Sequence, residues 1–309
     1  MGTPDLIFGQ DIAKAVLLDA GEADSLTGRY GEDVKRYVLQ GYWSFLCHAR
    51  WPWALSPTPG IMTTVAKRDV IVSSISSATP AVVTLSAVIA TSMAGRKFYM
   101  EGNQSVYRIA GHLAGTNLLT LDAGYVETET AGSAVIFQDE YNLPNACIKV
   151  WDPLHVRGQR YNPVPLIEKP EFEARYGRGS WSLGFGPIEA ACEIQPDAYS
   201  ASANGVVRRV RVAPWSEEAL NLEFDYTLFH SLDFTGAGDG DTPHCPRERR
   251  MVLVHLAVFE MFVNKDDTKA DQAITKARQL LEEMVPFYIP SQRGRFRTAP
   301  KHSATLGCT

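Results

Sequence analysis

The sequence predicts an α+β protein: a split helical bundle of N-terminal and C-terminal helices, with large β insertions and an extended C-terminal arm. Three observations predict this fold. Apolar residues recur with a helical period at both ends of the 309-residue chain. The middle of the chain alternates Val, Ile, Thr and Ser with Gly and Asn turns, and the last segment has no period. Since 45% of the residues are hydrophobic and 21% are charged, the chain can bury such cores.

Residues 1–57 are predicted to contribute the first two helices. Asp11 can cap the first helix, because a carboxylate satisfies free backbone N–H groups at a helix start. Gly21 and Gly28 bracket a break in the pattern. The second helix is expected over about 32–49, where apolar residues recur at spacings of three and four.

Tryptophan is concentrated around the end of the second helix. Trp43, Trp51 and Trp53 lie close together, and Pro52 and Pro57 stop the helical pattern. Such aromatic residues are typical core anchors, and a ligand-binding platform is the alternative interpretation.

Residues 58–144 change to a β pattern and are predicted to form a small β-barrel-like insertion. Short alternating stretches are separated by Gly and Asn residues. The expected strands are Asp69–Ser74, Val82–Ile89, Val106–Ile109, Leu118–Leu121 and Ala134–Phe137.

Residues 145–242 are predicted to form a second β-rich domain. Its expected strands are Ile148–Trp151, Gly205–Val212 and Ala219–Leu228. Pro-rich and Gly-rich connections lie between them, including Pro163 to Pro170.

Helical periodicity returns over residues 243–286. One helix is expected over about 247–263, and a second over about 269–285, with Pro286 as its stop. Neither terminal pair of helices can bury its apolar stripe alone. Residues 1–57 and 243–286 are therefore predicted to form one helical domain.

Several function classes find no support in the sequence. There is no P-loop, dinucleotide-binding GxGxxG, GxSxG or HExxH motif, so we do not expect an enzyme. No apolar stretch approaches the ~20 residues of a membrane helix, and the N-terminus lacks a signal-peptide pattern. The net charge of −5 argues against a general nucleic-acid binder. Five scattered cysteines without CxxC are expected to be reduced thiols.

No cofactor or metal ion is expected. Cys47–His48 and His244–Cys245 are adjacent pairs, without the spacing of a zinc site. Asp239 and Asp241 could bind calcium, but they lack the distal Glu and the length of an EF-hand loop, so a solvated turn is favoured. Adjacent acids such as Asp139 and Glu140 point to opposite faces of a strand, which argues against an acid/base pair.

The tail, residues 287–309, is predicted to be an extended arm and is the candidate site. It contains no acidic residue. In an extended chain its alternating arginines share one side and the intervening phenylalanine faces the other. The candidate partner-binding residues are Phe287, Tyr288, Arg293, Arg295, Phe296, Arg297 and Lys301. An acidic groove on a partner protein fits this pattern, and a solvated end or contact with nucleic acid are the alternatives.

Three stretches resemble the head–tail adaptor (connector) proteins of tailed bacteriophages. The first is DVKRYVLQGYWSFLCHARWPW, within residues 32–53. The second is YRIAGHLAGTNLLTLDAGY leading into IFQDEYNLP, within residues 107–144. The third is RVRVAPWSEEALNLEFDY followed by CPRERRMVLVHLAVFEMFVNKDDTKADQAITKARQLLEEM. The order of these pieces carries the resemblance, and the long β segments depart from smaller adaptors.

The resemblance implies a structural protein of the virion neck, made in the host cytoplasm. It would form a homo-oligomeric ring, most often of twelve subunits, docked under the portal protein. The ring would extend the DNA channel and provide a platform for tail, nozzle or stopper proteins. Double-stranded DNA would pass through without specific binding, no membrane is involved, and the C-terminal arm would reach into the portal.

Two other functions stay open at this point. One is another neck or tail component, such as a stopper or a tail terminator. The other is a glycan-binding or depolymerising β protein of the tail, for which Trp151, Trp181 and Trp215 are the residues to test.

Overall fold

The computed structural model describes residues 6–21, 26, 28–158, 163–177, 184–194, 208–236 and 239–289. The protein mixes helices and strands, and its contacts divide it into two compact units. We call them the helical unit and the β unit and describe each by itself. Among the helices in these ranges, none has the length and apolar character needed to cross a membrane.

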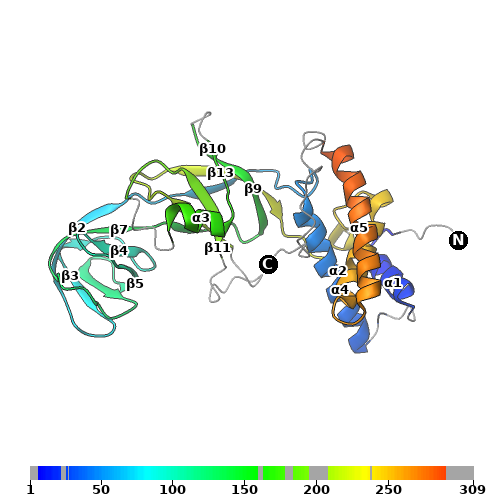
Figure 1. Cartoon of the computed structure of the whole chain (residues 1–309), viewed down its shortest axis with the longest axis horizontal. Helices are drawn as coiled ribbons and strands as arrows, with labels where there is room; N and C mark the ends of the chain where they lie inside the picture. The colour runs from blue at the N-terminus through cyan, green and yellow to red at the C-terminus, as the bar shows by residue number, and fades with distance from the viewer. Residues whose placement is uncertain are drawn as a thin grey trace. The chain divides into compact units, whose positions relative to one another are not determined.

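The helical unit takes the described parts of Met1–Thr58, Ala146–Val150 and Tyr226–Thr309 (Figure 1). It therefore combines helices from both ends of the sequence. Its α-helices are α1 (Gly9–Ala20), α2 (Gly28–His48), α4 (Met251–Phe262) and α5 (Asp267–Tyr288), with 3-10 turns η1 (Asp239–Asp241) and η2 (Arg247–Arg249).

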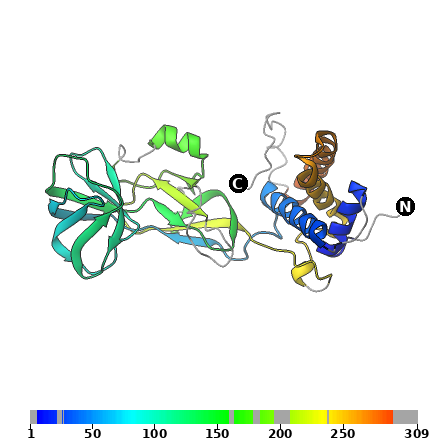
Figure 2. The same cartoon turned by 90° about the horizontal axis from the view of Figure 1, so that it is seen from below.

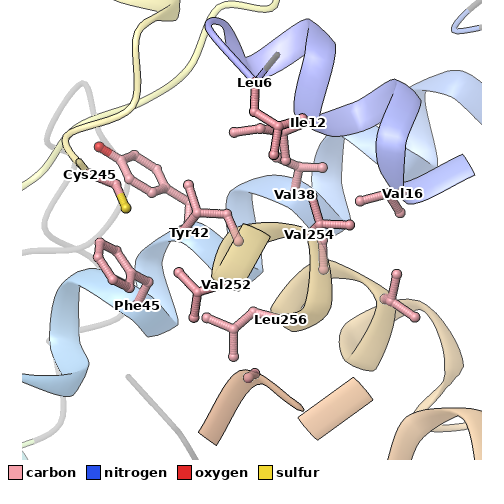
Figure 3. Close-up of a cluster of buried hydrophobic side chains, with 14 of the residues drawn as sticks. Leu6, Ile12, Val16, Val38, Tyr42, Phe45, Cys245, Val252, Val254 and Leu256 are labelled. Atoms are coloured by element: carbon pink, nitrogen blue, oxygen red, sulfur yellow. The ribbon is translucent and has the colours of Figure 1, made fainter. Parts of the chain in front are cut away.

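One hydrophobic core joins these four helices. Figure 3 shows side chains of α1, α2 and α4 converging, among them Ile12, Val38 and Leu256. Each of these three is nearly inaccessible to solvent, and Leu281 of α5 belongs to the same cluster. Helix α4 is apolar around most of its circumference because the other helices surround it.

The helix ends follow local chemistry. Asp11 is the third residue of α1, and its carboxylate accepts the backbone N–H groups of Ile7 and Phe8 at 3.1 and 2.9 Å. Gly21 ends α1 with a φ of 79°, which is costly for other residues. Asp266 caps α5 by accepting the N–H of Lys269.

The expectation that Pro286 stops the last helix is wrong, because α5 continues to Tyr288. A proline so near a helix end removes only one late backbone hydrogen bond. The final turn is held instead by the bond from the N–H of Ile289 to the carbonyl of Val285 and by the burial of Met284 and Val285.

The β unit takes the described parts of Pro59–Asn145 and Trp151–Asp225. Its strands are β1 (Gly60–Thr63), β2 (Arg68–Ile75), β3 (Val82–Ile89), β4 (Lys97–Met100), β5 (Val106–His112), β6 (Thr116–Leu121), β7 (Gly132–Phe137), β8 (Glu140–Asn142), β10 (Pro163–Val164), β11 (Ala190–Ile194) and β12 (Arg209–Ala213). Two further strands, β9 (Cys147–Val156) and β13 (Asn221–Leu228), contribute residues to both units.

Six strands close into a barrel in the order β2-β3-β6-β5-β4-β7 (Figures 1 and 2). Alternate residues such as Val83, Leu85 and Phe98 fill its interior. The five strands expected between residues 58 and 144 match β2, β3, β5, β6 and β7. Strand β4 was not expected, because its four residues are too short for a clear alternation.

Two smaller sheets complete the strand pairing, in the orders β1-β13-β9-β10 and β11-β12-β8. The helix α3 (Lys169–Tyr176) was not expected in this Pro-rich region. Pro170 lies in its first turn, where a missing N–H costs nothing, and Phe172 and Tyr176 are buried. The boundary near residue 145 between two β domains stays a prediction, since the β unit includes residues from both sides of it.

Candidate functional site

The start of the predicted C-terminal arm belongs to α5. Phe287 and Tyr288 lie in its last turn, so the expectation of an extended chain is wrong for these two residues. Arg293, Arg295, Phe296, Arg297 and Lys301 lie outside the described residues.

Tyr288 fixes the end of α5 on the helical unit. Its hydroxyl donates to Glu248 Oε1 at 2.7 Å, and its ring meets that of Trp53 edge-on at 4.9 Å between centroids. This hydrogen bond lowers the pKa of the Glu248 carboxyl. Phe287 meets the ring of Tyr288 edge-on at 4.7 Å between centroids and is still 66% exposed, so an apolar side chain is exposed at the end of α5.

An aromatic stack supports the position of Tyr288. The rings of Phe45, Trp51 and Trp53 follow one another with centroids 5.1 and 5.3 Å apart. Trp51 is fully buried, and its Nε1 donates to the carbonyl of Phe45 at 2.8 Å. Trp51 is therefore a core anchor with a satisfied polar group.

Cysteine and histidine form no metal centre in the part of the chain that the structure describes. Cys147, Cys192 and Cys245 are buried and are not disulfide-bonded. Cys47 is disulfide-bonded, so the expectation of five reduced thiols is wrong for this residue. Burial lowers the pKa of its neighbour His48 to about 4, which favours a neutral imidazole.

The expectation of a solvated turn over Asp239–Asp241 is wrong for Asp241. Asp241 is fully buried, and its Oδ1 accepts the N–H groups of Gly9 and Phe234 at 3.1 and 3.0 Å. Its Oδ2 accepts the N–H of Gly236. Burial raises the pKa of this carboxyl, and the backbone hydrogen bonds oppose the rise. Asp241 is a structural acceptor that the sequence pattern did not reveal.

The adjacent acids Asp139 and Glu140 meet one cation, contrary to expectation. Lys97 Nζ lies 2.8 Å from Asp139 Oδ2 and 3.1 Å from Glu140 Oε1. Strand alternation does not separate the two carboxylates, because Asp139 precedes β8. Arg211 Nε also donates to Asp139 Oδ2 at 2.9 Å, and Arg209 pairs with Glu140. These contacts make the pair part of a structural ion network around the buried Asp139.

Among the tryptophans to test for glycan binding, Trp215 does not lie on an exposed surface. Trp215 is buried and stacks on Phe137 at 3.7 Å between centroids, while Trp151 is partly exposed. Trp181 lies outside the described residues. Trp215 is therefore unavailable to a sugar.

The barrel wall has a groove of about 450 Å³ where β2 leaves β3. Strand β2 pairs with β3 over Val72–Ile75, but over Arg68–Val72 it pairs with β7. Ile71 and Val88 line this groove and are 62% and 64% exposed. Its lining includes Ser86 and Ser133 and the acids Asp69 and Glu101, but no histidine or cysteine.

No known family model matches the chain, and no curated protein matches it either.

Proposed function

We propose that this protein is a structural head–tail connector of a tailed bacteriophage, without enzymatic activity. It assembles as a ring of twelve copies under the portal protein in the virion neck. The ring extends the DNA channel and carries the tail, nozzle or stopper proteins. Its fold is a split helical bundle that presents the C-terminal arm.

The observation that carries this proposal is the helical unit itself. Helices from the two ends of the chain share one core, and the strands of the barrel are inserted between them in the sequence. The order of these parts agrees with the adaptor-like order of the three sequence stretches. Phe287 is exposed near the end of α5, and a basic segment follows it in the sequence.

Charge is consistent with a passive DNA channel. Twelve copies at −5 each give 12 × (−5) = −60 for the ring. Negative walls repel DNA phosphates and would not hold the DNA during its passage.

The first experiment is light scattering of the full-length protein, alone and mixed with the portal protein encoded in the same genome. The proposal expects a complex whose mass corresponds to a ring of copies on one portal. A protein that does not bind the portal and binds only tail-side components would support the role of a stopper or tail terminator. Glycan binding without either association would support the tail β protein.

The second experiment removes the arm while keeping α5. A chain ending at Ile289 retains the last turn of α5 and the contact of Tyr288 with Glu248. Because the truncation also removes Cys308, both chains are compared under reducing conditions. We expect unchanged helical content and weaker portal docking. Undiminished docking of this variant would refute the role of the arm.

Charge replacements in the arm, compared with charge replacements on α5, test whether the arm acts specifically. Replacing Arg295 and Arg297 with alanine should lower both docking and its dependence on salt. The matched control replaces Lys276 and Arg278, which are exposed on α5. If both double replacements weakened docking equally, docking would depend on the net charge of the protein, and a specific role of the arm would be contradicted.

A further inference from the structure

A polar cluster in the helical unit holds the segment between β13 and α4 against α2. We call the described residues of 229–245 the connecting segment. Tyr42 of α2 is the centre of the cluster, and Figure 3 shows its hydroxyl directed toward the part of the segment that carries Cys245. The cluster joins His230 and His244, which lie at opposite ends of the segment.

The hydrogen bonds of Tyr42 define how the cluster works. The Tyr42 hydroxyl oxygen accepts the backbone N–H of His244 at 2.7 Å. It also lies 3.1 Å from His230 Nδ1. Assigning the hydroxyl proton to this second contact satisfies both groups, with a neutral His230 accepting at Nδ1. No other acceptor for that proton is found among the described residues.

Two further contacts hold His230 in place. Trp43 Nε1 donates to the carbonyl oxygen of His230 at 3.1 Å. The imidazole rings of His230 and His244 lie 3.9 Å apart between centroids with an angle of 36°. A positive charge on one ring would therefore face the other ring at close range.

We propose that Tyr42, His230 and His244 form an acid-sensitive latch for the connecting segment. At neutral pH, His230 accepts the Tyr42 proton and the segment stays on α2. Protonation of His230 at Nδ1 converts this acceptor into a donor that faces the Tyr42 O–H proton. The Tyr42 O–H proton then has no acceptor among the described residues, protonation of His244 as well adds repulsion between two imidazolium rings, and the segment opens while the helices stay folded.

The electrostatic surroundings favour the neutral form. Burial, and then the nearby His244, lower the pKa of His230 to about 4, and burial also lowers the pKa of His244. Asp233 raises the pKa of His230 but does not reverse the shift. Near Tyr42 lie the buried Cys245 thiol and the Arg250 guanidinium. Burial raises the pKa of Tyr42 far above its usual value, so its hydroxyl proton stays available.

Linkage gives the size of the effect. With a pKa of about 4 in the closed latch and about 6.5 when open, the opening equilibrium rises by up to about 30-fold between pH 7.5 and pH 5. Because His230 is only partly buried, solvent screening reduces this factor. We expect an increase of at least about fivefold.

Hydrogen exchange of the full-length protein, read by mass spectrometry, tests the latch. After correction for intrinsic exchange rates, amide protection in peptides of the connecting segment should fall at least about fivefold between pH 7.5 and pH 5. Peptides of α4 and of the barrel strand β6 should change less. Uniform loss across the helical unit would overturn the latch in favour of general unfolding, and unchanged protection of the segment would also overturn it.

Three variants make the assignment specific. In His230→Asn the amide oxygen replaces Nδ1 as an acceptor and does not titrate, so the acid response of the segment should disappear. Tyr42→Phe should already expose the segment at pH 7.5 and respond less to acid. His155→Gln, on the exposed part of β9, is the matched control and should behave as the wild type. An acid response of His230→Asn equal to the wild type would refute the latch.

Discussion

Asp241 and Arg250 each satisfy backbone groups from distant parts of the chain. Asp241 accepts the N–H of Gly9, at the start of α1, and two N–H groups from its own segment. Arg250 donates to the carbonyl oxygens of Leu6, Pro243 and Cys245. These two buried charges tie the start of α1 to the segment before α4, because unpaired backbone groups there would be costly.

Replacing Asp241 with alanine should destabilise the helical unit by about 2–4 kcal/mol, because three N–H groups lose their acceptor. Asp241→Asn keeps one acceptor oxygen and should cost less. Urea unfolding followed by tryptophan fluorescence measures both changes. Asp271→Ala, on the exposed face of α5, is the control and should cost under about 0.5 kcal/mol. Equal losses for the two alanine variants would contradict the role of Asp241.

At the scale of elements, the crossing of α2 and α4 depends on close backbone approach. A Cβ added to Gly41 would lie 2.8 Å from the backbone nitrogen of Ala257 and 3.0 Å from the carbonyl carbon of Leu256. These are backbone atoms, which cannot turn aside as a flexible side chain can. Gly41 therefore sets the distance between two helices that are far apart in the sequence.

Gly41→Ala should force α2 and α4 apart and cost about 1–3 kcal/mol, despite the better helix propensity of alanine. Thermal unfolding by circular dichroism measures the change in stability. Gly111→Ala is the control, because its new Cβ would meet only Thr120 at 3.9 Å. A Gly41→Ala protein as stable as the wild type would show that the helices separate without cost.

The pairing of β8 with β12 depends on a second element-scale feature, the buried ion network. Arg211→Met would remove one of the cations beside Asp139, whose side chain is 1% exposed. We expect a loss of about 2–4 kcal/mol, since Lys97 still pairs with Asp139. Hydrogen exchange of β12 peptides measures this loss of stability.

Arg208→Met is the matched control for Arg211→Met. Arg208 pairs with Glu193 at 2.9 Å in a more exposed position, so its loss should cost under about 1 kcal/mol. If both variants lowered protection equally, burial of the Arg211 pair would not explain its contribution.

At the scale of the whole molecule, the perturbed histidines belong to the helical unit. Burial lowers the pKa of four of them below the ordinary 6.5: His48, His230, His244 and His255, with His48 and His230 at about 4. In the unfolded chain these groups take up protons as the pH falls through about 6.5, while the folded unit resists until lower pH. The contribution of these neutral histidines to the stability of the helical unit is therefore complete above pH 6.5, and it is lost progressively toward pH 4.

Acidification from pH 7.5 to pH 5.5 should therefore destabilise the helical unit more than the barrel. Burial raises the pKa of Asp241 and Glu260, and their protonation in the folded unit offsets part of this loss at lower pH. Hydrogen exchange of α4 peptides against β3 peptides compares the two units in one sample. Equal losses in both would contradict this origin of acid sensitivity.

The sequence alone determined the mixed α+β class, both helix pairs, and the five barrel strands with clear alternation. Periodicity reveals these because each residue there contacts solvent or core according to its own position. Only the tertiary structure decided the roles of Asp241, of the Asp139 network and of the Tyr42 cluster. Their partners lie far away in the sequence, and burial beside those partners gives them their chemistry. It also decided the continuation of α5 through Pro286, because packing of the last turn outweighs the local preference of proline.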